Sequence, residues 1–198
     1  MISHSHQIPN WVTNNTRVLD LGCGNGDLLV QLVNSHQIDA LGLELDPQKI
    51  ATCLDQGLSV IQQDLNSGLS NFNDQQFDTV IMTQTLQAIR RPDLVMSEML
   101  RVGREAIVTF PNFAYIRNRM QLGLSGHMPV NPQLPNPWYD TPNIHLSTFH
   151  DFEELCRTLS IQILDRDTSN LSGKRTWLGK VWPNLFGEFA VYRLTKEA

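Results

Sequence analysis

Short apolar runs alternate with segments of helical periodicity along the first 112 residues. Each run is only a few residues long, the length of a strand, and is followed by apolar residues spaced three or four apart. This alternation predicts a parallel sheet with right-handed crossover helices. The predicted strands are residues 18–21, 40–44, 59–62, 77–82 and 105–110.

Three helices are predicted between these strands, over residues 27–34, 48–55 and 92–102. The start of the second helix is marked by Pro47, which suits the first helical turn, and by Asp46, a candidate N-cap. At this helix the sequence therefore predicts the first residue as well as the type of element.

The character of the sequence changes at residue 111. Residues 111–143 are rich in asparagine, glycine and aromatic side chains, and they include six prolines. A loop of this length inside a compact domain is commonly a lid or a binding loop. Its aromatic residues favour an ordered lid over disorder. We therefore expect a lid-like insertion at about residues 111–147.

Beyond the lid, the periodicity predicts one more helix and two closing strands. The helix covers residues 151–159, with Thr148 or His150 as its cap, and the strands cover residues 161–164 and 188–194. Residues 1–198 are then expected to form a single α/β domain.

Composition places the chain among ordinary globular proteins, with 41% apolar and 18% charged residues. The formal net charge of −5 argues against a general nucleic-acid binder, because such proteins usually have a basic face. No apolar run approaches the length of about 18 residues that spans a membrane, so no membrane association is expected.

The cysteines and histidines show no metal-binding pattern. Cys23, Cys53 and Cys156 are an odd number of cysteines without paired spacing, so we expect reduced thiols and a cytoplasmic protein. The six histidines show no ligand spacing either, and no metal is expected.

Three glycines follow the first strand directly. The spacing Gly22-x-Gly24-x-Gly26 predicts a tight turn whose bare backbone can approach a ligand closely. The dinucleotide fingerprint Gly-x-Gly-x-x-Gly would need its third glycine at Asp27. This departure argues against a pyrophosphate ligand, and so does Asp20, which would repel phosphates but suit a cation.

Two further acids end the neighbouring strands. Glu44, at the end of the second strand, is placed to accept from both hydroxyl groups of a ribose. Asp64, near the end of the third strand, is placed to accept from an adenine amino group. Acids at three adjacent strand ends suit a nucleoside with a positively charged amino-acid tail, which describes S-adenosylmethionine; its product S-adenosylhomocysteine would bind the same residues. The predicted cofactor-binding residues are Asp20, Gly22, Cys23, Gly24, Gly26, Glu44, Leu45, Asp64, Leu65 and Thr83.

Each of these residues also has a purely structural interpretation. The glycines could only form a tight turn, and Asp20 could cap that turn through backbone N–H groups. Glu44 could be a solvated strand end and Asp64 a turn residue. Cys23, between two glycines, is better explained as a small packing residue than as a nucleophile.

The motifs at the first three strand ends resemble a known superfamily. Residues 18–26 (Val-Leu-Asp-Leu-Gly-Cys-Gly-Asn-Gly), 42–46 (Gly-Leu-Glu-Leu-Asp) and 63–65 (Gln-Asp-Leu) are similar to the first three motifs of class I S-adenosylmethionine-dependent methyltransferases. The resemblance implies a Rossmann-like, three-layer α/β sandwich. Its seven-stranded sheet is mostly parallel, with an antiparallel last strand.

A narrower resemblance covers nearly the whole chain. Residues 110–113 (Phe-Pro-Asn-Phe), 126–130 (Gly-His-Met-Pro-Val) and 138–145 (Trp-Tyr-Asp-Thr-Pro-Asn-Ile-His), followed by Asp151-Phe152, resemble the methionine biosynthesis protein family MetW. This resemblance implies a small methyltransferase-fold protein of methionine biosynthesis. It also implies a partner, the homoserine O-acyltransferase MetX, whose acylation of homoserine the protein supports.

No catalytic residue is evident from the sequence. Many small-molecule members of the superfamily have a histidine near Gln87, and nucleic-acid amino-methylating members have an Asn/Asp-Pro-Pro-aromatic tetrad there, but this chain has neither. The sequence leaves open whether a lid residue, Asp140 or His145, acts as a general base. The cluster Trp138, Tyr139, Asp140, Asn143 and His145 is a candidate substrate or partner site, or else closes the open end of the sheet as core.

Two functions follow from these observations. In the first, the protein binds the cofactor and supports a homoserine O-acyltransferase. In the second, it is a small-molecule S-adenosylmethionine-dependent methyltransferase with an unknown acceptor. A nucleic-acid methyltransferase is disfavoured by the acidic composition and the missing tetrad.

Overall fold

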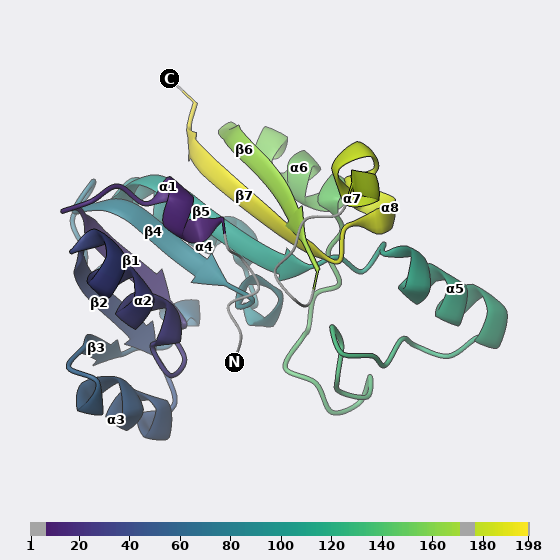
Figure 1. Cartoon of the computed structure of the whole chain (residues 1–198), viewed down its shortest axis with the longest axis horizontal. Helices are drawn as coiled ribbons and strands as arrows, with labels where there is room; N and C mark the ends of the chain where they lie inside the picture. The colour runs from purple at the N-terminus through teal and green to yellow at the C-terminus, as the bar shows by residue number, and fades with distance from the viewer. Residues whose placement is uncertain (1–6, 171–176, 198) are drawn as a thin grey trace.

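One seven-stranded sheet, in the order β3-β2-β1-β4-β5-β7-β6, forms the centre of the computed structural model, which describes residues 7–170 and 177–197 (Figure 1). The first five strands are parallel, and β7 runs antiparallel to both β5 and β6. This topology confirms the predicted fold class. The strands are β1 (Arg17–Leu21), β2 (Asp39–Glu44), β3 (Ser59–Gln62), β4 (Phe77–Thr83), β5 (Gly103–Pro111), β6 (Ile161–Ser169) and β7 (Phe189–Lys196).

Helices cover both faces of the sheet and make three layers. On one face, α4 and α6 pack against the larger core cluster; on the other, α1, α2 and α3 pack against a second cluster. The helical elements are α1 (Ile8–Trp11), α2 (Asp27–His36), α3 (Pro47–Asp55), η1 (Leu65–Ser67), η2 (Leu86–Ala88), α4 (Pro92–Val102), α5 (Ile116–Ser125), α6 (Phe149–Thr158), α7 (Trp177–Val181) and α8 (Pro183–Phe186).

The predicted caps of α3 and α6 are confirmed, although α6 begins at Phe149, two residues before its predicted start. The Asp46 side chain accepts from the backbone N–H of Gln48 at 2.9 Å, and α3 begins at the next residue, Pro47. At α6 the cap is Thr148, because its hydroxyl accepts from the N–H of Asp151 while the Asp151 carboxylate accepts from the N–H of Thr148. This reciprocal pair is a capping box, and it satisfies two donors that a helix start would otherwise leave open.

The last two strands are longer than predicted. β6 continues to Ser169, whereas the apolar pattern ends at residue 164. The extension is the polar stretch 165–169, and a register shift separates Ile163 from Asp165. β6 is the edge strand and pairs only with β7, and the side chains at positions 162, 164 and 166 are exposed, so the strand carries little apolar signal.

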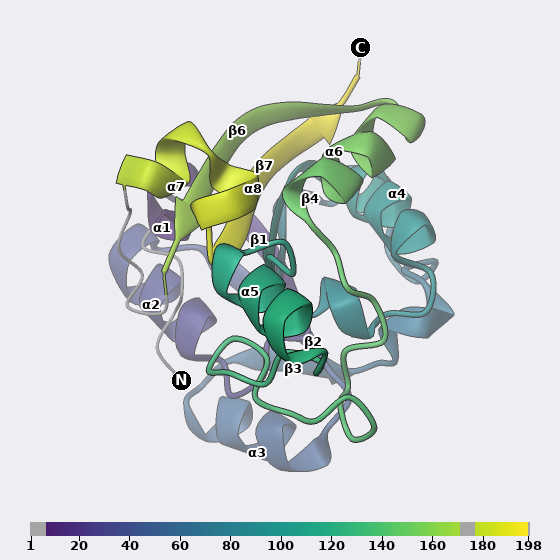
Figure 2. The same cartoon turned by 90° about the vertical axis from the view of Figure 1, so that its right-hand side faces the viewer.

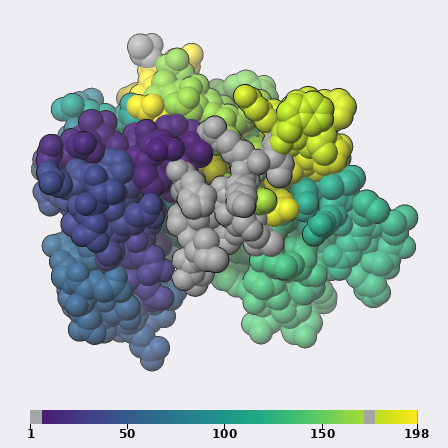
Figure 3. Space-filling model, viewed as in Figure 1, coloured from purple at the N-terminus to yellow at the C-terminus, as the bar shows by residue number. Residues whose placement is uncertain are grey.

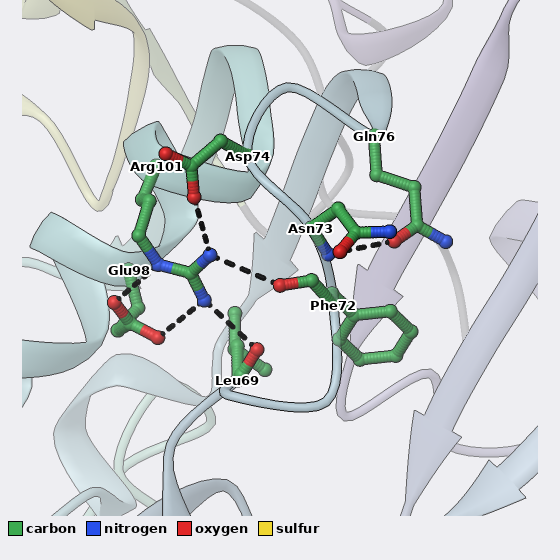
Figure 4. A network of polar contacts seen from close by, with 7 residues as sticks. All are labelled: Leu69, Phe72, Asn73, Asp74, Gln76, Glu98 and Arg101. Carbon is green, nitrogen blue, oxygen red and sulfur yellow. Dashed lines mark hydrogen bonds and ion pairs between the residues drawn. The ribbon is translucent and has the colours of Figure 1, made fainter.

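The connection between β3 and β4 is held by one arginine of α4. Arg101 donates to the carbonyl oxygens of Leu69 and Phe72, at 2.9 and 3.0 Å (Figure 4). It also donates to the carboxylates of Glu98 and Asp74. The planar guanidinium has enough fixed donors for all four partners, so this connection is fastened against α4.

Residues 111–147 leave the sheet after β5 and contain a helix that the sequence did not predict. Figure 2 shows this helix, α5, lying across the front of the molecule near α8. The sequence predicts this segment as a lid-like loop, because residues 116–125 have no apolar stripe; Asn118 is the one buried residue of α5. Polar contacts hold it instead of apolar packing.

Three asparagines fasten α5 and the loop that follows it. Asn112 is fully buried and donates to the carbonyl oxygens of Asn184 and Gly187, at 3.1 and 2.8 Å. Asn118 donates to the carbonyl oxygen of Asn112 and accepts from the side chain of Asn131 at 2.7 Å. Each buried amide is therefore satisfied by a contact that ties the segment to itself or to the α8 turn.

Candidate functional site

A cavity of about 590 Å³ opens where the carboxyl ends of the parallel strands meet. Strand order reverses at β1, with β2 on one side and β4 on the other, and such a switch point is where open α/β sheets bind ligands. The volume lies in the usual range for small-molecule sites. Its walls come from the turn after β1, the ends of β2, β4 and β5, and three lid residues: Asn136, Pro142 and Asn143.

The turn after β1 is held by backbone bonds to the neighbouring strand. The N–H groups of Gly22 and Cys23 both donate to the carbonyl oxygen of Leu43, at 2.8 and 3.0 Å. Gly24 has φ of +59°, and a Cβ built on it meets no atom within 4 Å. Since Gly24 also lines the cavity, its missing side chain leaves bare backbone facing the ligand space.

The other two glycines of the turn are required by packing. A Cβ on Gly22 would stand 2.7 Å from Oγ1 of Thr85, and one on Gly26 would overlap Cδ1 of Leu58. Both have positive φ, at +77° and +81°. Gly26 lies outside the cavity wall. A glycine is needed there because the start of α2 lies close to the segment before β3.

Asp20 is the most unusual group in the cavity. It lies near the end of β1 and is 1% exposed, and its Oδ1 has no hydrogen-bond partner. Burial, with a smaller contribution from the charge of Glu44, raises the pKa of Asp20 to about 7. A buried acceptor without a donor is destabilising on its own, so this carboxyl group is suited to a ligand that brings a donor and a positive charge.

Glu44 organises the glycine turn as well as facing the cavity. Its Oε2 accepts from the N–H of Gly24 at 2.9 Å, and its Oε1 accepts from the N–H groups of Leu45 and Asp46 at 2.8 and 3.1 Å. The side chain is buried, so it is not a solvated strand end. The carboxylate that caps the turn is therefore Glu44 and not Asp20.

The end of β4 brings a strained residue to the cavity. Gln84 has φ of +51°, which is uncommon for a residue with a side chain, and its N–H donates to the carbonyl oxygen of Thr109 at 2.9 Å. The Gln87 side chain donates to the carbonyl oxygen of Gln84. Thr83, Gln84 and Thr109 all line the cavity, and these side chains are neutral.

The lid reaches the cavity and is fastened beside it. The N–H groups of Ile144 and His145 both donate to the carbonyl oxygen of Gln87, at 2.9 and 3.0 Å. The preceding residue, Asn143, lines the cavity. This pair of bonds therefore holds the lid next to the end of β4.

The predicted cofactor-binding residues fall into two groups. The cavity wall includes Asp20, Gly22, Cys23, Gly24, Glu44 and Thr83, but not Gly26, Leu45, Asp64 or Leu65. Asp64 is exposed and caps the short helix η1, accepting from the backbone N–H of Asn66 at 2.9 Å. Leu45 is exposed, and Leu65 belongs to the core.

Of the lid residues predicted as a substrate or partner site, one lines the cavity and the others lie outside its wall. Asn143 lines the cavity, whereas Trp138 and Tyr139 are 73% and 75% exposed and pack edge to face on each other. They therefore do not close the sheet as core. Asp140 is exposed and outside the cavity wall, and the His145 ring lies 3.4 Å from the carbonyl oxygen of Arg90.

Some cavity residues were missed by the sequence reasoning. Ile8 reaches the cavity from α1, and Asn136 reaches it from the lid, although neither belongs to a recognisable motif. Thr109, near the end of β5, could have been found, because it pairs with Thr83 at the end of β4.

Cys23 and Cys53 lie beside the glycine turn, and neither thiol is activated as a nucleophile. Burial is the main cause that raises the pKa of both thiols, and the Cys53 thiol donates to the carbonyl oxygen of Gly24 at 3.2 Å. A thiol that stays protonated is a poor nucleophile, so packing explains Cys23.

The part of the chain that the structure describes contains no group of three His, Cys, Asp or Glu side chains arranged to hold a metal ion. Nor does any helix in residues 7–170 and 177–197 have the length and apolar content to cross a membrane.

Comparison with known proteins gives one family. The family model "Methionine biosynthesis protein MetW" matches residues 3–194. The chain is 39% identical, over 155 residues and 74% of its length, to the bifunctional methionine biosynthesis protein MetXA/MetW of Rhodopirellula baltica. It spans only 25% of that relative, which is a much longer protein.

Solved structures show the same fold at low identity. A SAM-dependent methyltransferase from Thermotoga maritima matches with a TM-score of 0.66 and 17% identity, covering 96% of this chain and 86% of that one. A SAM-dependent methyltransferase from Archaeoglobus fulgidus matches with a TM-score of 0.66 and 15% identity, covering 96% and 90%.

Proposed function

The chain belongs to the MetW family of methionine biosynthesis proteins, and from this membership we propose that it binds S-adenosylmethionine or S-adenosylhomocysteine and supports a homoserine O-acyltransferase. The single observation that carries the cofactor assignment is Asp20, a buried cavity carboxyl group with an unpartnered oxygen. A ligand with a positive amino group would supply the missing donor.

The described residues fit this cofactor in two further respects. Bare backbone at Gly24 leaves room that a Cβ would fill, so a ligand can approach the turn closely. Three acids in the wall, Asp20, Asp27 and Glu44, outnumber its one lysine. The excess of negative charge favours a cationic nucleoside over a diphosphate. In this assignment Asp20 binds the amino-acid tail of the cofactor. Glu44 accepts from the ribose hydroxyl groups with the lone pairs that its bonds to the backbone leave free.

S-adenosylmethionine would supply an electrophilic methyl group on a sulfonium sulfur. Transfer of that group to an acceptor that must lose a proton, such as a hydroxyl group, needs a general base. The lid side of the cavity instead presents neutral amides and hydroxyls, such as Gln84, Thr109 and Asn143, and no histidine is among the described residues that line it. This wall favours a cofactor-binding, supporting role over methyl transfer.

The partner assignment is supported by the long relative. Its name joins MetXA and MetW, and this chain matches one quarter of it. Two activities carried by one polypeptide commonly belong to proteins that work together, so a MetX-type acyltransferase is the expected partner.

The proposal is tested by the initial rate of homoserine acylation. The acyltransferase of the same organism is assayed alone and with one equivalent of the full chain, in the presence of S-adenosylmethionine. We expect the rate to rise on addition, and an unchanged rate at saturating protein would overturn the supporting role. The same samples are analysed for S-adenosylhomocysteine, because its accumulation with turnover would favour the alternative of a small-molecule methyltransferase.

A further inference from the structure

Exposed apolar side chains gather on α5 and the loop that follows it. We call the outer face of residues 116–146 the lid surface; Figure 3 shows these residues as a lobe at the right of the molecule. Leu124 is 82% exposed, and Trp138 and Tyr139 are nearly as exposed. Exposed apolar side chains concentrated in one segment are a feature of interaction sites in soluble proteins. Its large apolar side chains are Met120, Leu122, Leu124, Val130, Trp138, Tyr139, Ile144 and Leu146.

The helix α5 buries little of its surface against the other described residues. It has ten residues, and Asn118 is the one that is buried. A helix of that length is marginal in water without tertiary packing, so its apolar residues are not explained by the fold of this domain.

The lid surface is nevertheless held in place. The buried side chains of Asn112 and Asn118, with Asn131, connect α5 to the α8 turn and to the loop after it. Arg119 adds a bond to the carbonyl oxygen of Ala114. A rigid apolar surface loses less conformational entropy on binding than a mobile one, which favours recognition of another protein.

The charge of the segment narrows the choice of partner. Residues 116–146 contain Arg117 and Arg119 and one acidic residue, Asp140, in a chain of net charge −5. A symmetric dimer through this surface would bring together two copies of the same net positive charge. The lid surface is therefore better matched by a different protein that presents apolar side chains bordered by carboxylates.

We propose that the lid surface binds the homoserine O-acyltransferase, and that the acyltransferase contributes an apolar patch bordered by carboxylates. This inference rests on the proposed function, which supplies the partner. The long relative carries its MetXA and MetW parts in one polypeptide. In such a protein the MetXA part is available to cover the equivalent surface.

The test compares two surface variants with a matched control. Leu124→Glu and Trp138→Ser alter exposed side chains and should leave the fold intact, since neither side chain is buried. Leu54→Glu makes the same change at a residue that is 56% exposed on α3, a helix that lies far from α5 in Figure 1. Affinity for the purified acyltransferase is measured by calorimetry with the full chain. We expect at least tenfold weaker binding for the two lid variants, and unchanged binding for Leu54→Glu.

The outcomes separate the two proposals. If the unmodified chain binds the acyltransferase and both lid variants bind equally well, the docking surface is refuted and the proposed function stands. If the unmodified chain does not bind at all, the proposed function fails. Sedimentation equilibrium and flotation with anionic phosphatidylserine vesicles are run in parallel, and self-association or vesicle binding that the lid variants abolish would assign the surface to a second copy or a membrane and overturn the proposal.

Discussion

Asp20→Asn isolates the effect of one buried charge on stability. The substitution keeps the size of the side chain and removes its ionisation. The pKa of Asp20 is raised from 3.8 to about 7, because the folded state places the carboxyl group away from water and next to Glu44. Each pKa unit corresponds to about 1.4 kcal/mol, so ionised Asp20 destabilises the fold by about 4 kcal/mol.

The sign of the pH dependence follows from proton binding. Between pH 3.8 and about 7 the folded protein retains a proton on Asp20 that the unfolded chain has released. The contribution of Asp20 to the free energy of unfolding therefore falls as pH rises through this window and levels off above it. Asp20→Asn should match the unmodified protein near pH 4 and exceed its stability by up to about 4 kcal/mol at pH 8.

Urea denaturation at pH 5, 6, 7 and 8, followed by tryptophan fluorescence, measures this difference. Asp39→Asn is the control, because Asp39 is an exposed carboxylate at the start of β2 and its variant should keep the profile of the unmodified protein. A constant difference between Asp20→Asn and the unmodified protein across this range would refute the reasoning.

Three further predictions concern the turn and the lid. Gly24→Val should abolish cofactor binding in calorimetry, whereas Gly57→Ala, at a positive-φ glycine whose Cβ also meets open space, should retain it; equal loss in both would contradict the close-approach role of Gly24. Glu44→Ala should weaken cofactor binding by on the order of 2–3 kcal/mol and also lower the free energy of unfolding by about 1–3 kcal/mol, because three backbone N–H groups lose their acceptor; unchanged affinity would remove Glu44 from the site. Asn112→Ala should destabilise the protein by about 2–3 kcal/mol in urea and speed proteolysis within residues 126–147; resistance to both would show that α5 is held by other contacts.

The central sheet was predictable because its strands are short apolar runs and the helices between them have a clear period. The β3 and α4 bounds agree with the sequence pattern residue for residue, and the caps of α3 and α6 follow from Asp46 and Thr148. The end of β6 was missed because residues 165–169 are all polar and continue no apolar pattern.

The lid was predictable as a segment but not as a structure. Proline and aromatic content marks its limits, yet α5 is held by asparagine side chains, and one of them, Asn112, bonds to a turn about 70 residues later. A contact of that range leaves no periodic signal in a single sequence.

The candidate site was predictable only in part, for a similar reason. Asp20, Gly24 and Glu44 were found because they belong to strand ends and to a glycine turn, and they line the cavity. Their hydrogen bonds could not be read from spacing: Glu44, and not Asp20, accepts from the turn. Ile8 and Asn136 reach the cavity only through the tertiary fold.

The most direct measurement is calorimetric titration of the full chain with S-adenosylhomocysteine at pH 7, with NAD⁺ titrated under the same conditions. The account predicts one-to-one binding of the adenosyl ligand, weakened at least tenfold by Asp20→Asn, and no binding of the dinucleotide. Binding of NAD⁺ in its place, or equal affinity in Asp20→Asn, would contradict the assignment of the cavity.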